Sequence, residues 1–278
     1  MVVTEIGKTV LLGDLTRKQA EHYITDSRLM GILNDEEFEE SLREIDRIWT
    51  EKENKVSVLI FSCDSYSDVW GPFFTLFFRY WDCPYKVYLA AETEQCLLPE
   101  VRTINEEADT WTERIRKCVE ELPSKYVICM CEDMFFRRPV KQDMIDTCIQ
   151  YMDENPNIAC FNFEKEYGWY EPSDYPDFGR KPDRSAYRNS CQPSLWRKSI
   201  LEEMLSINAS PWEWETSTAE NPYEFYIFTG EADDLAFEYG YHNNKWFGIQ
   251  KGRWVIHDVL PLFKREGIDI DYSIRGIV

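Results

Sequence analysis

The sequence predicts an α/β protein with a mostly parallel central sheet, preceded by a helical hairpin. From residue 55 onward, apolar β-branched runs alternate with amphipathic segments, the order expected of a parallel sheet covered on both faces. Residues 13–53 instead carry apolar residues at helical spacing. With 278 residues, 44% of them hydrophobic, the chain can build one large core. We therefore expect an extension over 1–54 and a single larger domain over 55–278.

The N-terminal extension is interpreted as two helices separated by a break. LTRKQAEHYITDSRLM and DEEFEESLREIDRIWTEKEN each keep helical periodicity, and GILN between them supplies Gly and Asn. Asp35, Glu36 and Glu37 suit a helix start, where the helix dipole favours carboxylates. The segment resembles short helical-hairpin oligomerisation modules, which implies a homo-oligomer. The alternative is a cap that packs on the main domain.

The main domain is predicted to continue as strand, helix, strand, helix, strand. KVSVLIFSCD is a strand buried on both faces, and VWGPFFTLFFRYW is an aromatic helix that tolerates Pro72 near its start. YKVYLAAETE is a second strand, followed by the helix EADTWTERIRKCVEELP, which ends at Pro123. YVICMCED is a third strand, QDMIDTCIQYMDENP a helix and IACFNFE a further strand.

Composition excludes several classes of function. A formal charge of −20 argues against nucleic acid and anionic lipid as partners, because phosphate groups would be repelled. No apolar stretch reaches the roughly 18–20 residues that a membrane span needs. The nine cysteines lie mostly inside apolar runs, which is typical of reduced thiols in a cytoplasmic protein. Cys129 and Cys131 have no second pair to complete a zinc site.

Three predicted strands end in acidic residues. Asp64 ends the first, Glu92 the second, and Glu132 with Asp133 the third. The carboxyl ends of parallel strands share one edge of the sheet, where ligands bind, so we expect these side chains to lie together. Carboxylates in such number repel one another unless a cation lies among them. Magnesium or manganese prefers such oxygen ligands together with phosphate oxygens, so the pattern predicts a site for a cation and a nucleoside diphosphate.

These residues resemble a nucleotide-diphospho-sugar glycosyltransferase with the GT-A fold, a Rossmann-like α/β fold, over residues 55–260. VSVLIFSCDSYSD is similar to the first strand and loop that cradle the nucleotide, and YVICMCEDMFF to the strand that carries an acidic metal-binding pair. In the family, an acidic residue after the second strand contacts the base. The resemblance implies these nucleotide-sugar-binding residues: Ser62, Asp64, Glu92, Arg114, Glu132 and Asp133.

The resemblance also implies a divalent cation, manganese or magnesium. Its ligands would be Asp133, Glu132 and His257, the last in the apolar segment GRWVIHDVL, which we interpret as a strand. The acidic pair is Glu-Asp-Met rather than Asp-x-Asp, so one usual carboxylate is missing. Without a metal, arginines would balance the phosphates. The candidates for that role are Arg114, Arg137 and Arg138, with a salt bridge or a solvated turn as the alternative.

NSCQPSLWRKSILEEML and SPWEWE resemble the acceptor-side half of bacterial members of the family. Indole rings pack on sugar faces and can desolvate a neighbouring carboxylate, which raises its pKa. The resemblance therefore implies acceptor binding by Trp212 and Trp214, and a catalytic base at Glu215 or Glu213. The alternative is an aromatic core with solvated glutamates. Residues 164–188 are predicted to form a long loop that borders the acceptor site and becomes ordered on binding.

We therefore expect a cytoplasmic, hexosyl-type glycosyltransferase that moves a sugar from a nucleoside diphosphate to a carbohydrate or lipid-linked acceptor. Inversion at the anomeric carbon and a setting in bacterial cell-surface polysaccharide synthesis are part of this expectation. The alternative is a non-catalytic carbohydrate- or nucleotide-binding protein of the same fold. A nucleotidyltransferase is less favoured, because the loop CDSYSD has neither glycine nor a basic residue. Asp233 and Asp234 are interpreted as a helix start rather than a second catalytic pair.

Overall fold

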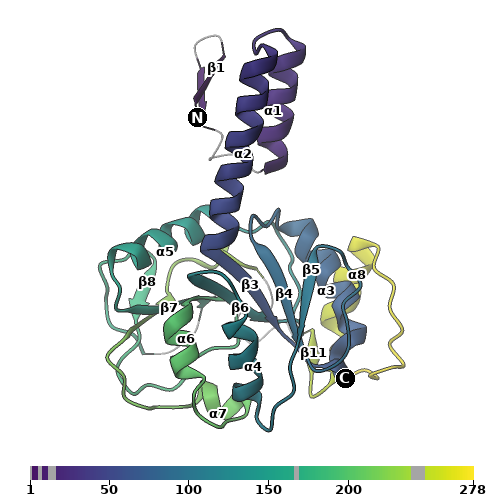
Figure 1. Cartoon of the computed structure of the whole chain (residues 1–278). Coiled ribbons are helices and arrows are strands. Elements are labelled where there is room, and N and C mark those ends of the chain that lie inside the picture. Colours follow the sequence, from purple (N-terminus) through teal and green to yellow (C-terminus); the bar gives the residue numbers. More distant parts are fainter. Residues whose placement is uncertain (1, 6–7, 12–16, 166–168, 239–247) are drawn as a thin grey trace.

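A computed structural model describes residues 2–5, 8–11, 17–165, 169–238 and 248–278. These residues form an α/β domain around a large, mostly parallel sheet, with a pair of helices standing out from it (Figure 1). The predicted fold class is confirmed, and the arrangement is consistent with a Rossmann-like fold. None of the described helices is both long enough and apolar enough to cross a membrane.

The central sheet contains the strands that carry the predicted acidic ends. Their spatial order is β5 (Val101–Asn105), β4 (Lys86–Ala91), β3 (Val56–Phe61), β6 (Tyr126–Cys131), β9 (Ser194–Arg197), β7 (Ile158–Lys165), β10 (Glu224–Phe228) and β8 (Phe178–Arg180). Strands β9 and β8 run antiparallel to their neighbours, and the other pairings are parallel. Phe61 of β3 is in register with Ala90 of β4 and Cys131 of β6. The three strands therefore end at the same level, as predicted.

Helices cover both faces of this sheet. One face carries α3 (Ser67–Tyr80), α5 (Gln142–Glu154) and α8 (Ile256–Glu266), and the other carries α4 (Trp111–Glu120), α6 (Lys198–Met204) and α7 (Pro211–Glu215). Side chains alternate along β3, so that Val58 and Ile60 join the first core while Leu59 and Phe61 join the second. Burial on both faces explains why β3 and β6 are continuous apolar runs.

Several short elements have no counterpart among the predictions. Strands β5, β8 and β9 were not expected, and neither were the two-stranded sheets β1 (Val2–Glu5) with β2 (Lys8–Leu11) and β11 (Ile249–Gln250) with β12 (Arg253–Trp254). The part of the chain that the structure describes also contains the 3-10 helices η2 (Asp64–Tyr66) and η3 (Ala232–Asp234). The predicted acidic helix start at Asp233 and Asp234 is therefore a single short turn.

Two predictions about secondary structure need correction. His257 lies in the first turn of α8, not on a strand, because the buried apolar residues Val259, Leu262 and Phe263 follow helical spacing. The segment 164–188 is not wholly a loop, since β7 continues to Lys165 and β8 pairs with β10. Residues 166–168 of that segment lie outside the described residues.

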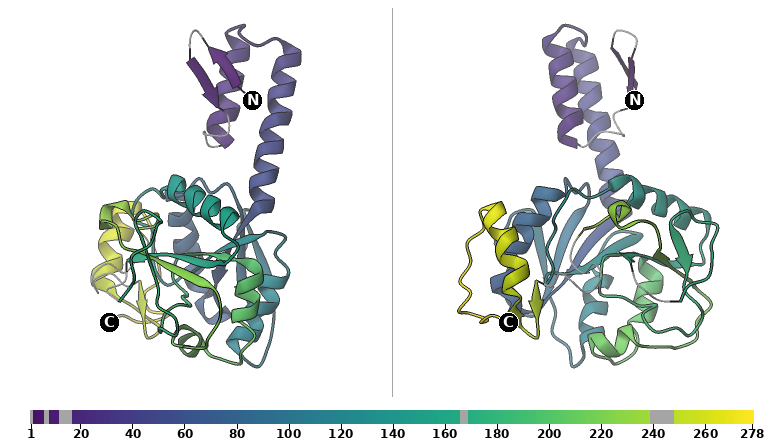
Figure 2. Two further views of the ribbon diagram at one scale, coloured as in Figure 1. Left: turned by 90° about the vertical axis from the view of Figure 1, so that its left-hand side faces the viewer. Right: turned by 180° about the vertical axis from the view of Figure 1, so that it is seen from behind.

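The helices α1 (Arg17–Leu29) and α2 (Asp35–Lys55) form the predicted hairpin, which stands clear of the sheet domain (Figure 2). A capping box starts α2: the amide of Glu37 donates to Asn34 Oδ1 at 3.0 Å, and the amide of Asn34 donates to Glu37 Oε2 at 2.9 Å. The hairpin has its own small core, made of Ala20, Ile24, Ile45 and Trp49.

A separate core predicts that the hairpin opens independently of the sheet. Trp49→Ala removes a side chain that is 3% exposed, at a cost of about 3 kcal/mol. In hydrogen exchange we expect the amides of α1 and α2 to exchange at least tenfold faster, with protection in β3 and β6 unchanged. The matched change Phe77→Ala, in the sheet core, should instead lower protection in β3 and β6. Equal loss of protection in hairpin and sheet after Trp49→Ala would contradict a boundary near residue 54.

Candidate functional site

Glu132 and Asp133 follow β6 at the carboxyl edge of the sheet. Glu132 is only 4% exposed, and its Oε1 accepts a hydrogen bond from the hydroxyl of Ser62 at 2.6 Å. The indole N–H of Trp70 donates to the same Ser62 oxygen at 2.7 Å, which fixes the hydroxyl toward Glu132. Asp133 is partly exposed, but its Oδ1 is buried without a hydrogen-bond partner among protein groups. The strand thus ends in two carboxylates with few compensating donors.

Burial and nearby negative charges raise the pKa values of both acids. Removal of water, and then the charge of Asp133, raise the pKa of Glu132 to about 8. Removal of water, together with the nearby charge of Glu215, raises the pKa of Asp133 to about 6. Near neutral pH the pair therefore resists full ionisation unless a cation joins it.

Asp64 lies in a different electrostatic environment. Its carboxylate accepts hydrogen bonds from the amides of Glu92, Thr93 and Glu94 at 3.0–3.1 Å, and from the hydroxyl of Thr93 at 2.6 Å. Partial burial opposes ionisation, but these donors outweigh it and lower the pKa of Asp64 to about 2. In return the amide of Asp64 donates to Glu92 Oε2 at 2.6 Å. Asp64 thus links the β3 and β4 loops, and its nucleotide-binding role stays a prediction.

Arg114 brings a buried positive charge to the same edge. It projects from α4, is 6% exposed, and donates through Nη2 to the carbonyl oxygen of Ser62 at 2.7 Å. Its Nε lies 3.5 Å from Glu92 Oε1, so both oxygens of Glu92 have partners in this structure. Its Nη1 is buried and has no hydrogen-bond acceptor. An unsatisfied guanidinium N–H at this position is suited to an anionic ligand.

The C-terminal segment reaches this edge through Arg275, which no sequence pattern indicated. Its Nε donates to Asp68 Oδ2 at 2.9 Å, its Nη2 donates to Asp68 Oδ1 and to the carbonyl of Ser65, and its guanidinium lies 4.1 Å from the ring centre of Tyr66. Its charge partly offsets the pKa rise of Glu132. The partners are 207 residues apart in sequence, so no local signal could reveal them.

Glu215 is held by the segment that precedes β9. The amide of Cys191 donates to Glu215 Oε1 at 2.8 Å, and the amide of Tyr187 donates to the Glu215 carbonyl at 2.7 Å. The charge of Glu215 contributes to the raised pKa of Asp133. The sequence did not predict this hydrogen bond between Cys191, in the segment before β9, and Glu215.

The other residues of SPWEWE play different parts. Glu213 forms a capping box with Ser210, whose amide and hydroxyl donate to Glu213 Oε2 at 2.8 and 2.7 Å and lower its pKa. Trp212 is 75% exposed and free to meet a ligand. The acceptor-binding prediction for Trp214 is wrong, because its ring is fully buried and its indole N–H donates to the carbonyl of Met204 at 2.9 Å.

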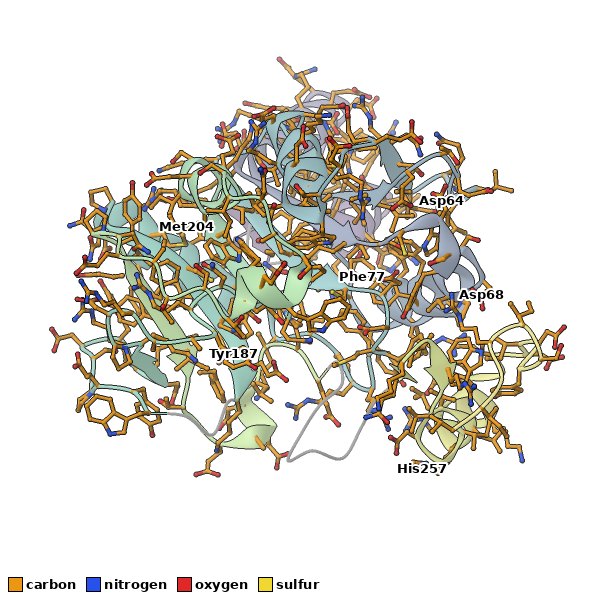
Figure 3. The ribbon with its side chains drawn as sticks, turned by 90° about the horizontal axis from the view of Figure 1, so that it is seen from below. Asp64, Asp68, Phe77, Tyr187, Met204 and His257 are labelled. Atoms are coloured by element: carbon orange, nitrogen blue, oxygen red, sulfur yellow. The ribbon has the colours of Figure 1, made fainter. Side chains whose placement is uncertain are left out.

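His257 does not join the carboxylates. Its side chain is 73% exposed and lies 3.5 Å from Asp258. Figure 3, which looks onto the carboxyl edge from below, places His257 well apart from Asp64. Among the described residues no three His, Cys, Asp or Glu side chains come together as a metal site, so the predicted three-ligand set is corrected. Glu132 and Asp133 alone, with one unsatisfied buried oxygen, still fit a hard cation that takes its other ligands from phosphate and water.

Arg138 is held by another segment. It pairs with Glu238 at 3.0 Å and donates to the carbonyls of Asp233 and Ala232 at 2.9 Å. The amide of neighbouring Arg137 donates to the Glu238 carbonyl at 3.0 Å. These contacts favour a structural role for Arg138 over phosphate binding. The alternative expected for the two arginines, a solvated turn, does not describe them fully, because both side chains are partly buried.

No protein-family model matches the chain, and no curated protein matches it either. Among 167 matching chains of solved structures, S. aureus TarS (residues 1–349) has 10% identity and a TM-score of 0.42 over 80% of this chain and 68% of that one. The mannosyltransferase PcManGT from Pyrobaculum calidifontis, solved with GDP-Man and Mn2+, has 8% identity and a TM-score of 0.38 over 81% and 70%.

The bifunctional IspDF from Campylobacter jejuni has 12% identity and a TM-score of 0.35, and the match covers 55% of this chain but only 44% of that protein. The matches also include a cytidylyltransferase from Leptospira borgpetersenii. That cytidylyltransferase has 15% identity to this chain and a TM-score of 0.37. With such low identities and TM-scores, function must be argued from the site.

The raised pKa of Glu132 predicts that the free energy of unfolding decreases as the pH rises. Between about pH 4.5, the ordinary value, and about pH 8, the folded chain binds a proton that the unfolded chain has released, so stability falls as pH rises. Glu132→Gln removes this loss. In urea unfolding at pH 8 with a chelator present, we expect the variant to be about 2–4 kcal/mol more stable than the parent, with the difference vanishing near pH 4.5. Glu213→Gln, on the surface, is the control and should not stabilise. If Glu132→Gln were less stable than the parent at pH 8, the claim that the ionised form of Glu132 destabilises the fold would be wrong.

Proposed function

We propose that the chain is a glycosyltransferase that transfers a sugar from a nucleoside diphosphate to a carbohydrate or lipid-linked acceptor. One observation carries this proposal: an acidic pair with raised pKa values lies on the same sheet edge as a buried guanidinium that has one N–H group without an acceptor. Glu132 and Asp133 supply the first, and Arg114 supplies the second. A nucleoside diphosphate with a bound metal ion suits both groups. Its metal ion would bind the carboxylates, and its phosphate oxygens would accept hydrogen bonds from the arginine.

Glu132 and Asp133 would hold manganese or magnesium, and Ser62 and Arg114 would position the diphosphate. When bound, the cation supplies Lewis-acid neutralisation of the charge that develops on the leaving diphosphate. Asp64 and Glu92 support this arrangement by holding the β3 and β4 loops together. Contact of Glu92 with the base remains part of the proposal.

Glu215 is the proposed general base. It would take the proton of an acceptor hydroxyl, whose oxygen forms a bond to the anomeric carbon while the bond from that carbon to the diphosphate breaks on the opposite side. Direct displacement inverts the anomeric centre. The charge of Glu215 contributes to the raised pKa of Asp133, whereas the capped Glu213 carries a lowered pKa that makes it the weaker base. The exposed ring of Trp212 would pack against the acceptor.

The proposed setting is bacterial cell-surface polysaccharide synthesis, with the chemistry in the cytoplasm. Support for the setting comes from the resemblance of the sequence to that class. Support for the compartment comes from nine free cysteines, which suit a reducing environment. We also propose that the hairpin of α1 and α2 mediates self-association, because its tip exposes Leu29 and Met30.

The second candidate is a binding protein of the same fold without turnover. The observation that favours it is the Glu-Asp-Met sequence, with no third metal ligand among the described residues. Donor hydrolysis separates the two, because transferases of this kind slowly transfer sugar to water. Released nucleoside diphosphate after long incubation with donor alone would support catalysis.

A nucleoside diphosphate is expected to bind in a metal-dependent way. In calorimetric titrations with uridine, guanosine, adenosine, cytidine and thymidine diphosphates, at least one should bind at micromolar to millimolar Kd with manganese present, and at least tenfold more weakly with chelator. Asp133→Asn should remove the effect of manganese, because it lowers the charge of the acidic pair. Asp234→Asn, a surface control, should leave it unchanged. No heat with any of the five at millimolar concentration would overturn the assignment.

The base assignment predicts a separation of binding from turnover. Glu215→Gln should lower kcat by about 10²–10⁴ while the Kd of the donor diphosphate changes less than threefold. The matched change Glu213→Gln should keep kcat within about threefold, since its carboxylate only caps α7. A large loss of kcat in Glu213→Gln with little loss in Glu215→Gln would reverse the assignment.

A further inference from the structure

A second hollow lies beside α7 and does not include the acidic pair. Its walls come from three segments: Arg188 and Asn189; Glu203, Met204, Ser206 and Ile207 at and after the end of α6; and Ser217, Ala219, Glu220 and Asn221. Its volume is about 190 Å³, enough for one monosaccharide-sized group. Figure 3 labels Met204 of its wall, and Tyr187 next to Arg188, on the side of the carboxyl edge away from Asp64.

One wall residue of this hollow is Arg188, which carries a positive charge and is only 4% exposed. Its Nη2 donates to Asn221 Oδ1 at 2.6 Å, and its guanidinium lies 4.3 Å from the ring centre of Phe225. Its Nε and Nη1 are buried without hydrogen-bond acceptors. Burial lowers the pKa of Arg188, only partly offset by the charge of Asp183. A buried guanidinium is unfavourable when no carboxylate contacts it.

The two carboxylates in the same walls are engaged elsewhere. Glu203 accepts a hydrogen bond from the hydroxyl of Tyr223 at 2.6 Å. Glu220 pairs with the exposed Arg184. Neither is among the contacts of Arg188. Within the described residues no ion pair neutralises this guanidinium, and the charge of Asp183 acts on it without a hydrogen bond to it, so an anionic ligand would stabilise its charge.

We infer that this hollow binds a sugar that carries an oxyanion, either a carboxylate or a phosphate, with the oxyanion at Arg188. The rest of the lining suits sugar hydroxyls, because Asn189, Ser206 and Ser217 offer amide and hydroxyl groups. Met204 and Ile207 offer apolar surface for the face of a pyranose ring.

The hollow shares its supports with the proposed base. Asn189 Nδ2 donates to the carbonyl of Trp214 at 2.9 Å, and the amide of Tyr187 donates to the carbonyl of Glu215 at 2.7 Å. The segment that carries Arg188 therefore also positions α7. An anionic sugar in the hollow is the acceptor, or the acceptor's terminal unit; this role rests on the proposed function, but the binding itself does not.

The test is direct binding of three matched hexoses to the full chain without donor or metal. Glucuronate, glucose 6-phosphate and glucose are titrated separately by ligand-observed NMR. We expect glucuronate or glucose 6-phosphate to bind at least tenfold more tightly than glucose. A preference for glucuronate identifies a carboxylate ligand, and a preference for glucose 6-phosphate identifies a phosphate ligand.

Two matched variants locate the interaction. Arg188→Gln should lower the affinity for the preferred anionic hexose at least tenfold, whereas Arg184→Gln, an exposed arginine beside the same hollow, should lower it less than threefold. Arg188→Lys keeps the charge and should retain measurable binding, which also covers the case in which Arg188→Gln does not fold. Equal affinity for all three hexoses, or equal losses in Arg184→Gln and Arg188→Gln, would overturn the inference. Hexose binding without nucleoside diphosphate binding would overturn the proposed function and leave the anionic-sugar site standing.

Discussion

The structure depends on one electrostatic conflict, the burial of two adjacent carboxylates at the end of a central strand. β6 lies between β3 and β9 and is covered on both faces, so the chain that leaves it carries Glu132 and Asp133 out at the edge of the core. Water is largely removed, and the pKa values rise to about 8 and about 6. A fold that keeps such a pair is stabilised when a cation binds there.

A neighbouring carboxylate shows that this conflict is not imposed by the sheet edge itself. Asp64 leaves β3 at the same level, yet three amides and a hydroxyl lower its pKa to about 2. Glu132 accepts a single hydrogen bond from the hydroxyl of Ser62, and the indole N–H of Trp70 donates to the oxygen of that hydroxyl. The same edge therefore contains a satisfied acid, which links two loops, and an unsatisfied pair. This difference distinguishes an acid whose ionised form is satisfied by protein donors from a pair whose ionised form is not, where residue type cannot.

The sequence was sufficient for the parts of the fold that local patterns encode. Continuous apolar runs identify β3, β4 and β6, and their parallel pairing brings the acidic ends to one edge. Contacts between segments far apart in sequence could not be predicted from local patterns. Arg275 contacts Asp68 only because the C-terminal segment folds back onto the sheet edge. SPWEWE shows the same limit within six residues. Its two tryptophans are alike in sequence, but the position of α7 against α6 leaves Trp212 outside and places Trp214 in the core.

A chain of net charge −20 repels anionic ligands at long range, but the distance of most carboxylates from the sheet edge weakens this repulsion there. At physiological ionic strength the Debye length is about 8 Å, so most surface carboxylates are screened from the sheet edge. Buried guanidinium groups such as Arg114 and Arg188 are screened much less, and they determine which anions bind locally. The negative field of the whole chain also raises the concentration of cations near it. A nucleoside diphosphate that has already bound a divalent cation carries less negative charge, so it is the form that both the long-range field and the acidic pair favour.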